Sequence, residues 1–88
     1  MRPERLTIGQ VIGVFGLRGE LKVKIETDFP ERFAALRRVF LDEAEYTAES
    51  SRLHKGMALL KLQGVNDPER AAELVGAQVD VALEDAVP

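Results

Sequence analysis

Three glycines at three-residue spacing constrain this chain most, because they separate two segments that both have the pattern of β-strands. Gly13, Gly16 and Gly19 stand between an apolar run that ends at residue 15 and an alternating run over residues 20–26. Glycine adopts the positive φ values that tight turns require. The spacing therefore predicts a β-hairpin whose turn is formed by residues 16–19.

The second run has the clearer strand pattern. Leu21, Val23 and Ile25 would lie on one face of an extended segment, and Lys22 and Lys24 on the other. This alternation predicts a half-buried strand with a charged outer face.

The remaining chain is predicted to form short elements separated by turn residues. Asp28 and Asn66 each precede a Pro-Glu pair and are the predicted N-caps of two brief helices. The first run is predicted to be a strand with a bulge near residues 9 and 10. The other predicted elements are a helix to residue 36, strands at 37–41, 46–55 and 57–63, a helix at 66–74 and a strand at 77–83.

Six short strands and two brief helices indicate an all-β fold. Closure of the sheet would remove exposed strand edges, so the prediction is a small six-stranded antiparallel Greek-key-type β barrel with two short helices. A chain of 88 residues is expected to form one domain with a modest core. In the strand after residue 56, Ala58, Leu60 and Leu62 are predicted to face that core.

Composition excludes several classes of site. The chain has no cysteine and one histidine, His54, which excludes thiolate chemistry and leaves little for a histidine-based metal centre. No acid, base and nucleophile stand in a recognisable arrangement, so no enzyme activity, cofactor or metal is expected. No apolar run is long enough to span a bilayer, so a cytoplasmic protein with no membrane partner is expected.

Charge is distributed unevenly along the chain. The net charge is −3, but residues 1–40 hold eight Lys or Arg against five acids, and residues 41–88 hold four against ten. An acidic balance argues against broad, non-specific binding to phosphate backbones. The basic half remains compatible with an RNA contact, and the acidic half with a basic protein partner.

The glycine-rich turn has two interpretations. Glycines can bring backbone amides close to a phosphate, but the segment after Gly19 is a predicted strand rather than a helix, so it does not match a nucleotide-binding fingerprint. The glycines are therefore interpreted as turn formers. Phe15, Leu17 and Arg18 flank or occupy the turn, where an apolar pair beside a guanidinium would suit docking on a protein or RNA surface.

The lysines of the alternating strand also have two interpretations. Lys22 and Lys24 form a ridge that Arg18, Arg37 and Arg38 would extend if the third strand lies nearby. Such a ridge would contact phosphates. The alternative is a solvated strand face that discourages edge pairing.

Three segments carry a resemblance to a known family. Residues 13–23 (GVFGLRGELKV) and 27–33 (TDFPERF), with a Gly-Val-x-Asp-Pro-Glu run from Gly64, resemble the N-terminal domain of the RimM family of bacterial ribosome maturation factors. Many members carry a histidine ahead of the Gly-Leu pair, where this chain has Phe15. The resemblance implies a six-stranded antiparallel barrel over residues 1–85. It also implies that residues 86–88 begin a linker to a C-terminal PRC-type barrel absent from this chain.

The resemblance also implies a function. Proteins similar to RimM are non-enzymatic factors that assist assembly of the head of the small ribosomal subunit and bind a head ribosomal protein. For this chain we expect a monomer that contacts the immature small subunit, with adjacent rRNA as a further candidate contact. The expected partner-binding residues are those of the hairpin with two secondary contacts: Phe15, Gly16, Leu17, Arg18, Gly19, Lys22 and Lys24.

Two other functions remain open from the residues alone. One is a general RNA-binding barrel like those of translation factors, although Tyr46 is the only tyrosine and there is no tryptophan for base stacking. The other is a small ligand- or flavin-binding barrel, for which the residues supply no catalytic group.

Overall fold

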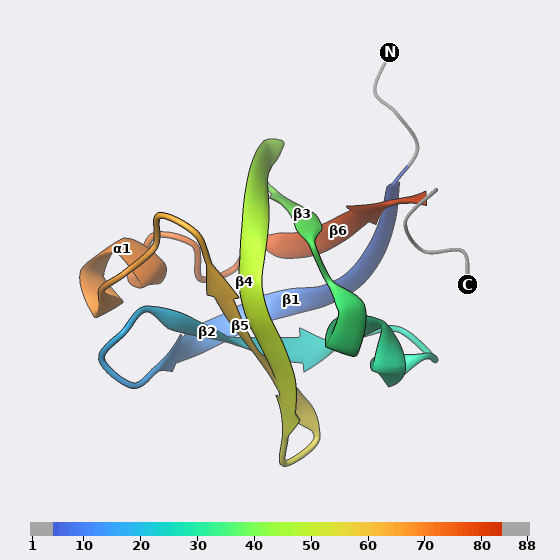
Figure 1. Ribbon diagram of the computed structural model, residues 1–88, viewed down its shortest axis with the longest axis horizontal. Helices are drawn as coiled ribbons and strands as arrows, with labels where there is room; N and C mark the ends of the chain where they lie inside the picture. The colour runs from blue at the N-terminus through green and yellow to red at the C-terminus, as the bar shows by residue number, and fades with distance from the viewer. Residues whose placement is uncertain (1–4, 84–88) are drawn as a thin grey trace.

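The computed structural model describes residues 5–83, and it shows a closed antiparallel barrel of six strands (Figure 1). Around the barrel the strands follow the order β1-β2-β5-β4-β3-β6, and β6 pairs with β1 to close it. The predicted antiparallel barrel is confirmed. The strands are β1 (Arg5–Phe15), β2 (Glu20–Ile25), β3 (Arg38–Leu41), β4 (Ala44–His54), β5 (Met57–Leu62) and β6 (Gln78–Ala82).

This order separates β2 from β3, its successor in the chain, by the hairpin of β5 and β4. Two residues, Lys55 and Gly56, connect β4 to β5, and both have positive φ (52° and 80°). Such turns match the twist of a two-stranded hairpin. The arrangement places β5 between the lysine-bearing β2 and the polar β4.

The core is formed by inward side chains of β1, β2, β3, β5 and β6, and Tyr46 and Ala48 of β4 pack against it. Ala58, Leu60 and Leu62 are fully buried in it, as the alternation predicted. Each large apolar side chain buried this way contributes about 1.5–3 kcal/mol relative to exposure. The other core residues are Ile8, Val11, Leu21, Val23, Phe33, Val39, Leu41, Val65, Ala71, Leu74, Ala77, Val79 and Val81.

Strand β1 has eleven residues, and it changes register against each of its two neighbours. The shift against β6 lies between Thr7 and Gly9, and the shift against β2 lies between Val11 and Gly13. The predicted irregularity near residues 9 and 10 is therefore present. An added Cβ at Gly9 would lie 2.6 Å from the carbonyl oxygen of Lys24, so only glycine allows this close approach of the two strands.

The two helices differ from their predictions. The first, η1 (Pro30–Ala35), is a 3₁₀ helix; its N-cap is Phe29, and no side chain caps it, so the predicted cap by Asp28 is wrong. The second, α1 (Pro68–Ala72), is capped by Asp67 rather than by Asn66. The Asp67 carboxylate accepts a hydrogen bond of 2.7 Å from the backbone N–H of Arg70. The described part of the chain thus has one short α-helix and one 3₁₀ helix.

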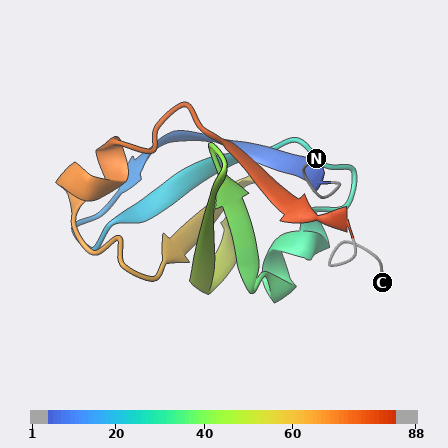
Figure 2. The same ribbon diagram turned by 90° about the horizontal axis from the view of Figure 1, so that it is seen from above.

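The β1–β2 hairpin and α1 lie at one end of the barrel, and the start of β1 and the end of β6 lie at the other (Figures 1 and 2). Neither helix within residues 5–83 has the length and apolar character needed to cross a membrane. The expected domain boundary at residue 85 and the expected linker at residues 86–88 lie outside the described residues.

Candidate functional site

The turn of the first hairpin projects two side chains into solvent. Gly16 and Gly19 have φ values of 71° and 86°, as the tight turn requires. Between them, Leu17 is 85% exposed and the Arg18 side chain is 81% exposed. An aliphatic side chain that protrudes this far makes no contribution to the core, so the tip is available for a partner.

The base of the hairpin, in contrast, is firmly supported. Gly19 is buried, and a Cβ there would meet the carbonyl oxygen of Val65 at 2.7 Å and the backbone nitrogen of Asp67 at 2.9 Å. Gly19 therefore packs on the loop that leads into α1. This makes Gly19 a structural residue of the predicted site, whereas Gly16 has no atom within 4 Å of an added Cβ.

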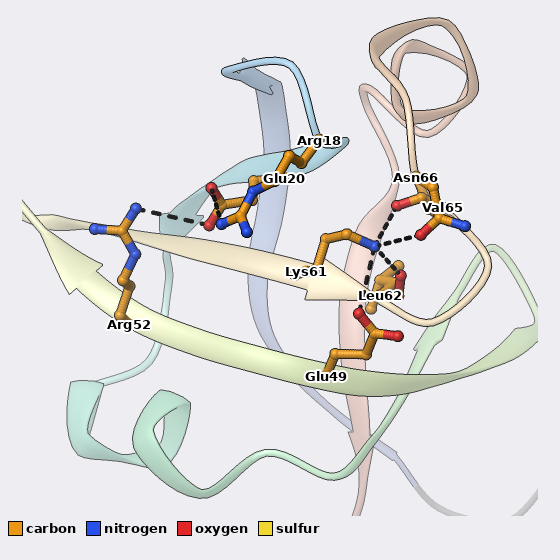
Figure 3. A network of polar contacts seen from close by, with 8 residues as sticks. All are labelled: Arg18, Glu20, Glu49, Arg52, Lys61, Leu62, Val65 and Asn66. Carbon is orange, nitrogen blue, oxygen red and sulfur yellow. Dashed lines mark hydrogen bonds and ion pairs between the residues drawn. The ribbon is translucent and has the colours of Figure 1, made fainter.

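Lys61 holds the loop on which Gly19 rests. Its ammonium group donates to the carbonyl oxygens of Leu62 (2.9 Å) and Val65 (2.6 Å) and to Oδ1 of Asn66 (2.8 Å), as Figure 3 shows. It also lies 3.5 Å from a carboxylate oxygen of Glu49. The Lys61 side chain is only 13% exposed, so these charge-assisted bonds are largely shielded from water.

A buried carboxylate lies directly after the turn. The Glu20 side chain is 8% exposed and lies between two guanidinium groups, those of Arg18 and Arg52, each 3.7 Å from one of its oxygens (Figure 3). Arg52 comes from β4, more than thirty positions further along the chain. The two guanidiniums compensate the buried charge of Glu20 and remain largely exposed themselves.

Two rings complete this contact between β1 and β4. The guanidinium of Arg52 lies 5.9 Å from the centre of the Phe15 ring, and the ring of His54 lies 5.6 Å from it, tilted by 57°. Phe15 is thus partly buried against β4 side chains rather than free at the tip. Phe15 therefore supports the base of the hairpin through packing.

Lys22 and Lys24 lie on the outer face of β2, as predicted. Lys22 is opposite Leu59 of β5, and Leu59 is opposite Arg52 of β4. Leu59 is fully buried, although it is not a member of the hydrophobic cluster that fills the barrel. The seven predicted site residues therefore gather on the hairpin and the adjoining outer face of β2.

The third strand does not extend this ridge, contrary to one expectation. β3 pairs with β4 and β6, so two strands separate it from β2. Arg38 instead lies over the ring of Phe40 (5.6 Å), on whose face Arg5 also lies (3.9 Å). Arg37 and Arg38 are therefore removed from the site.

Two residues of this surface, Arg52 and His54, are not predicted from the sequence. Both lie on the outer face of β4, but only the pairing of β4 with β5, and of β5 with β2, brings them to the hairpin. The sequence signal that could have identified them is their spacing of two residues in a polar strand, which places both on one face. Within residues 5–83 no group of three or more His, Cys, Asp or Glu side chains is arranged to hold a metal ion.

Comparison with known proteins gives consistent matches. The family model described as the RimM N-terminal domain matches residues 6–86. A protein named ribosome maturation factor RimM from Symbiobacterium thermophilum is 39% identical over 90 residues, which cover 99% of this chain and 51% of the relative. The protein of the same name from Dehalococcoides mccartyi is 38% identical over 78 residues, with coverages of 89% and 47%.

Solved structures agree with the sequence matches. The solution structure of the N-terminal domain of RimM from Thermus thermophilus superposes with a TM-score of 0.79 at 26% identity, covering 100% of this chain and 98% of that one. A crystal structure from Pseudomonas aeruginosa, described as a putative 16S ribosomal RNA processing protein RimM, gives 0.82 at 29% identity, covering 92% and 52%. The chain spans about half the length of the curated relatives it matches. On these matches, the chain belongs to the RimM family and corresponds to its N-terminal domain.

Proposed function

We propose that this chain is the barrel domain of a ribosome maturation factor, which assists assembly of the head of the small ribosomal subunit without catalysis. Membership of the RimM family and the names of its relatives support this role. The observation that carries the proposal is the hairpin tip, where exposed Leu17 and Arg18 stand on a base fixed by Gly19.

The proposed mode of action is docking on a head ribosomal protein of the immature subunit, next to rRNA. Leu17 would enter an apolar depression of the partner, since a protruding aliphatic side chain gains most when a pocket removes it from water. Arg18 beside it would face the rRNA next to that protein. Because the base is held in place before contact, little ordering of the backbone would oppose binding. The domain would act as a cytoplasmic monomer.

An amide-shift NMR titration of the 88-residue chain with the purified head protein tests this. We expect shifts concentrated in residues 15–24. The Leu17→Ser variant should weaken binding, because it removes the protruding apolar group without touching the core. Phe29→Ser is the matched control: Phe29 is 52% exposed and lies away from the hairpin beside η1, so its loss should leave binding unchanged.

Two results would contradict the proposal. One is the absence of any shift from a folded chain with either the head protein or immature small subunits. The other is an equal effect of the Leu17 and Phe29 variants on binding.

A further inference from the structure

The outer faces of β2, β5 and β4 form one continuous surface on which cations gather. Lys22 and Lys24 lie on β2, Arg52 lies opposite Leu59 in the same row as Lys22, and Arg18 lies at the adjoining turn. These two lysines and two arginines make up the basic face. They concentrate positive charge although the chain as a whole carries a net charge of −3. A local concentration of this kind attracts anions even on an acidic protein.

The two guanidiniums of the basic face are held in place before any ligand arrives. Glu20 anchors both, at 3.7 Å each, and Arg52 also lies over the ring of Phe15. Their side chains stay 81% and 54% exposed, so both remain accessible to a ligand. Planar guanidiniums fixed in this way bind phosphate oxygens with two parallel hydrogen bonds.

The spacing and polarity of the surface favour a phosphodiester chain over a protein. Lys22 and Lys24 are two residues apart on one strand face, hence about 7 Å apart, a separation comparable with that of successive phosphates in an extended strand. A protein interface has an apolar centre, but of the two apolar residues that β5 places between these cations, Leu59 is fully buried and Met57, opposite Lys24, is partly buried.

We propose that the basic face binds the phosphate backbone of a single-stranded RNA segment, with Arg18 and Arg52 as a guanidinium pair positioned by Glu20. Lys22 and Lys24 contact neighbouring phosphates as point charges. The inference rests on the proposed function. It divides the binding surface of the domain in two: the Leu17 tip contacts protein, and the basic face contacts RNA. It adds Arg52, a residue of β4, to the contact residues and gives Glu20 a positioning role.

Fluorescence anisotropy with a labelled, unstructured oligoribonucleotide, measured over a range of salt concentrations, tests this. Arg52→Gln should weaken binding and make the plot of log K against log salt less steep by about 0.7, the value for one lost phosphate contact on a single strand. Arg37→Gln removes the same charge from an exposed residue away from this face, and both the affinity and the slope should stay as in the unaltered chain.

A second variant separates geometry from charge. Arg52→Lys keeps the positive charge but loses the planar fork that faces Glu20 and Phe15. It should bind RNA more weakly than the unaltered chain at every salt concentration, with the same slope. Lys22→Gln should also make the plot of log K against log salt less steep. This variant keeps both arginine partners of Glu20, so its effect on RNA binding does not depend on the stability of the Glu20 cluster.

Several outcomes overturn the inference. Equal affinities and slopes for the Arg52→Gln and Arg37→Gln variants would remove the basic face from RNA binding. Equal RNA affinity of the Arg52→Lys variant and the unaltered chain would show that RNA binding does not need the guanidinium pair. If the chain binds the head protein through Leu17 but not RNA, the proposed function stands and this inference fails. A loss of head-protein affinity in the Lys22→Gln variant as large as that in the Leu17→Ser variant would assign the face to protein.

Discussion

Replacing Gly19 by alanine isolates the contact that supports the hairpin. The new methyl group would lower the free energy of unfolding in two ways. The backbone has a φ of 86°, and the added Cβ would lie 2.7 Å from the carbonyl oxygen of Val65 and 2.9 Å from the backbone nitrogen of Asp67. Both atoms belong to backbone, and the carbonyl is already bonded to Lys61, so neither can move aside easily.

Two other glycines separate these costs. Gly16 has a φ of 71° and open space around an added Cβ, so Gly16→Ala introduces only the strain of the left-handed conformation, about 1–2 kcal/mol. At Gly9 the φ is not in that region, but the Cβ would lie 2.6 Å from two atoms, so Gly9→Ala introduces only overpacking, about 1–3 kcal/mol. Gly19→Ala should combine both effects and cost about 2–5 kcal/mol.

Urea and thermal denaturation of the three variants measure these values. A domain of this size loses about 4–8 °C of Tm per kcal/mol, so Gly19→Ala should lower Tm by about 10 °C or more and Gly16→Ala by distinctly less. If Gly19→Ala is no more destabilising than Gly16→Ala, the hairpin does not rest on the 65–67 loop, and the account of a fixed base is wrong.

Three further changes test other parts of the structure by urea denaturation. Lys61→Met should cost about 2 kcal/mol because shielded acceptors lose their donor, while Lys24→Met, at an exposed site, should stay within about 0.5 kcal/mol. Asp67→Ala should cost about 1 kcal/mol through loss of the N-cap of α1, and rescue by Asn at this position would confirm the acceptor role. Phe33→Ala should cost about 3–5 kcal/mol, whereas half-exposed Phe29→Ala should cost less than about 1 kcal/mol; similar losses for the two would contradict the packing described.

Two phenylalanines show a difference between helix types that the sequence pattern does not reveal. Phe29 and Phe33 are four residues apart, and on an α-helix they would share one face. The segment is a 3₁₀ helix that begins after Phe29. With three residues per turn, positions four apart differ by about 120° in direction, so Phe33 enters the core and Phe29 remains half exposed. The sequence carries the Pro-Glu start but does not distinguish the two helix types.

Local alternation, in contrast, predicted the strands and the hairpin well. Leu21 and Val23 face the core and Lys22 and Lys24 face outward because side-chain direction in a strand has a period of two. Pairing between distant strands has no comparable local signal. The insertion of β5 between β2 and β4 decides which cations surround the hairpin: it adds Arg52 and leaves out the arginines before and within β3.

The same pairing explains why the candidate site combines an exposed tip with a rigid base. Lys61 lies on β5, reaches Glu49 on β4, and fixes the loop against which Gly19 packs. The next residue, Glu20, then ties the turn to Arg52 of β4. Two independent contacts thus connect the hairpin base to the β4–β5 pair, while the side chains at the tip of the turn protrude into solvent. A partner that binds the tip therefore meets exposed side chains on a backbone that is already ordered, which lowers the entropic cost of docking without reducing the exposure of the contact residues.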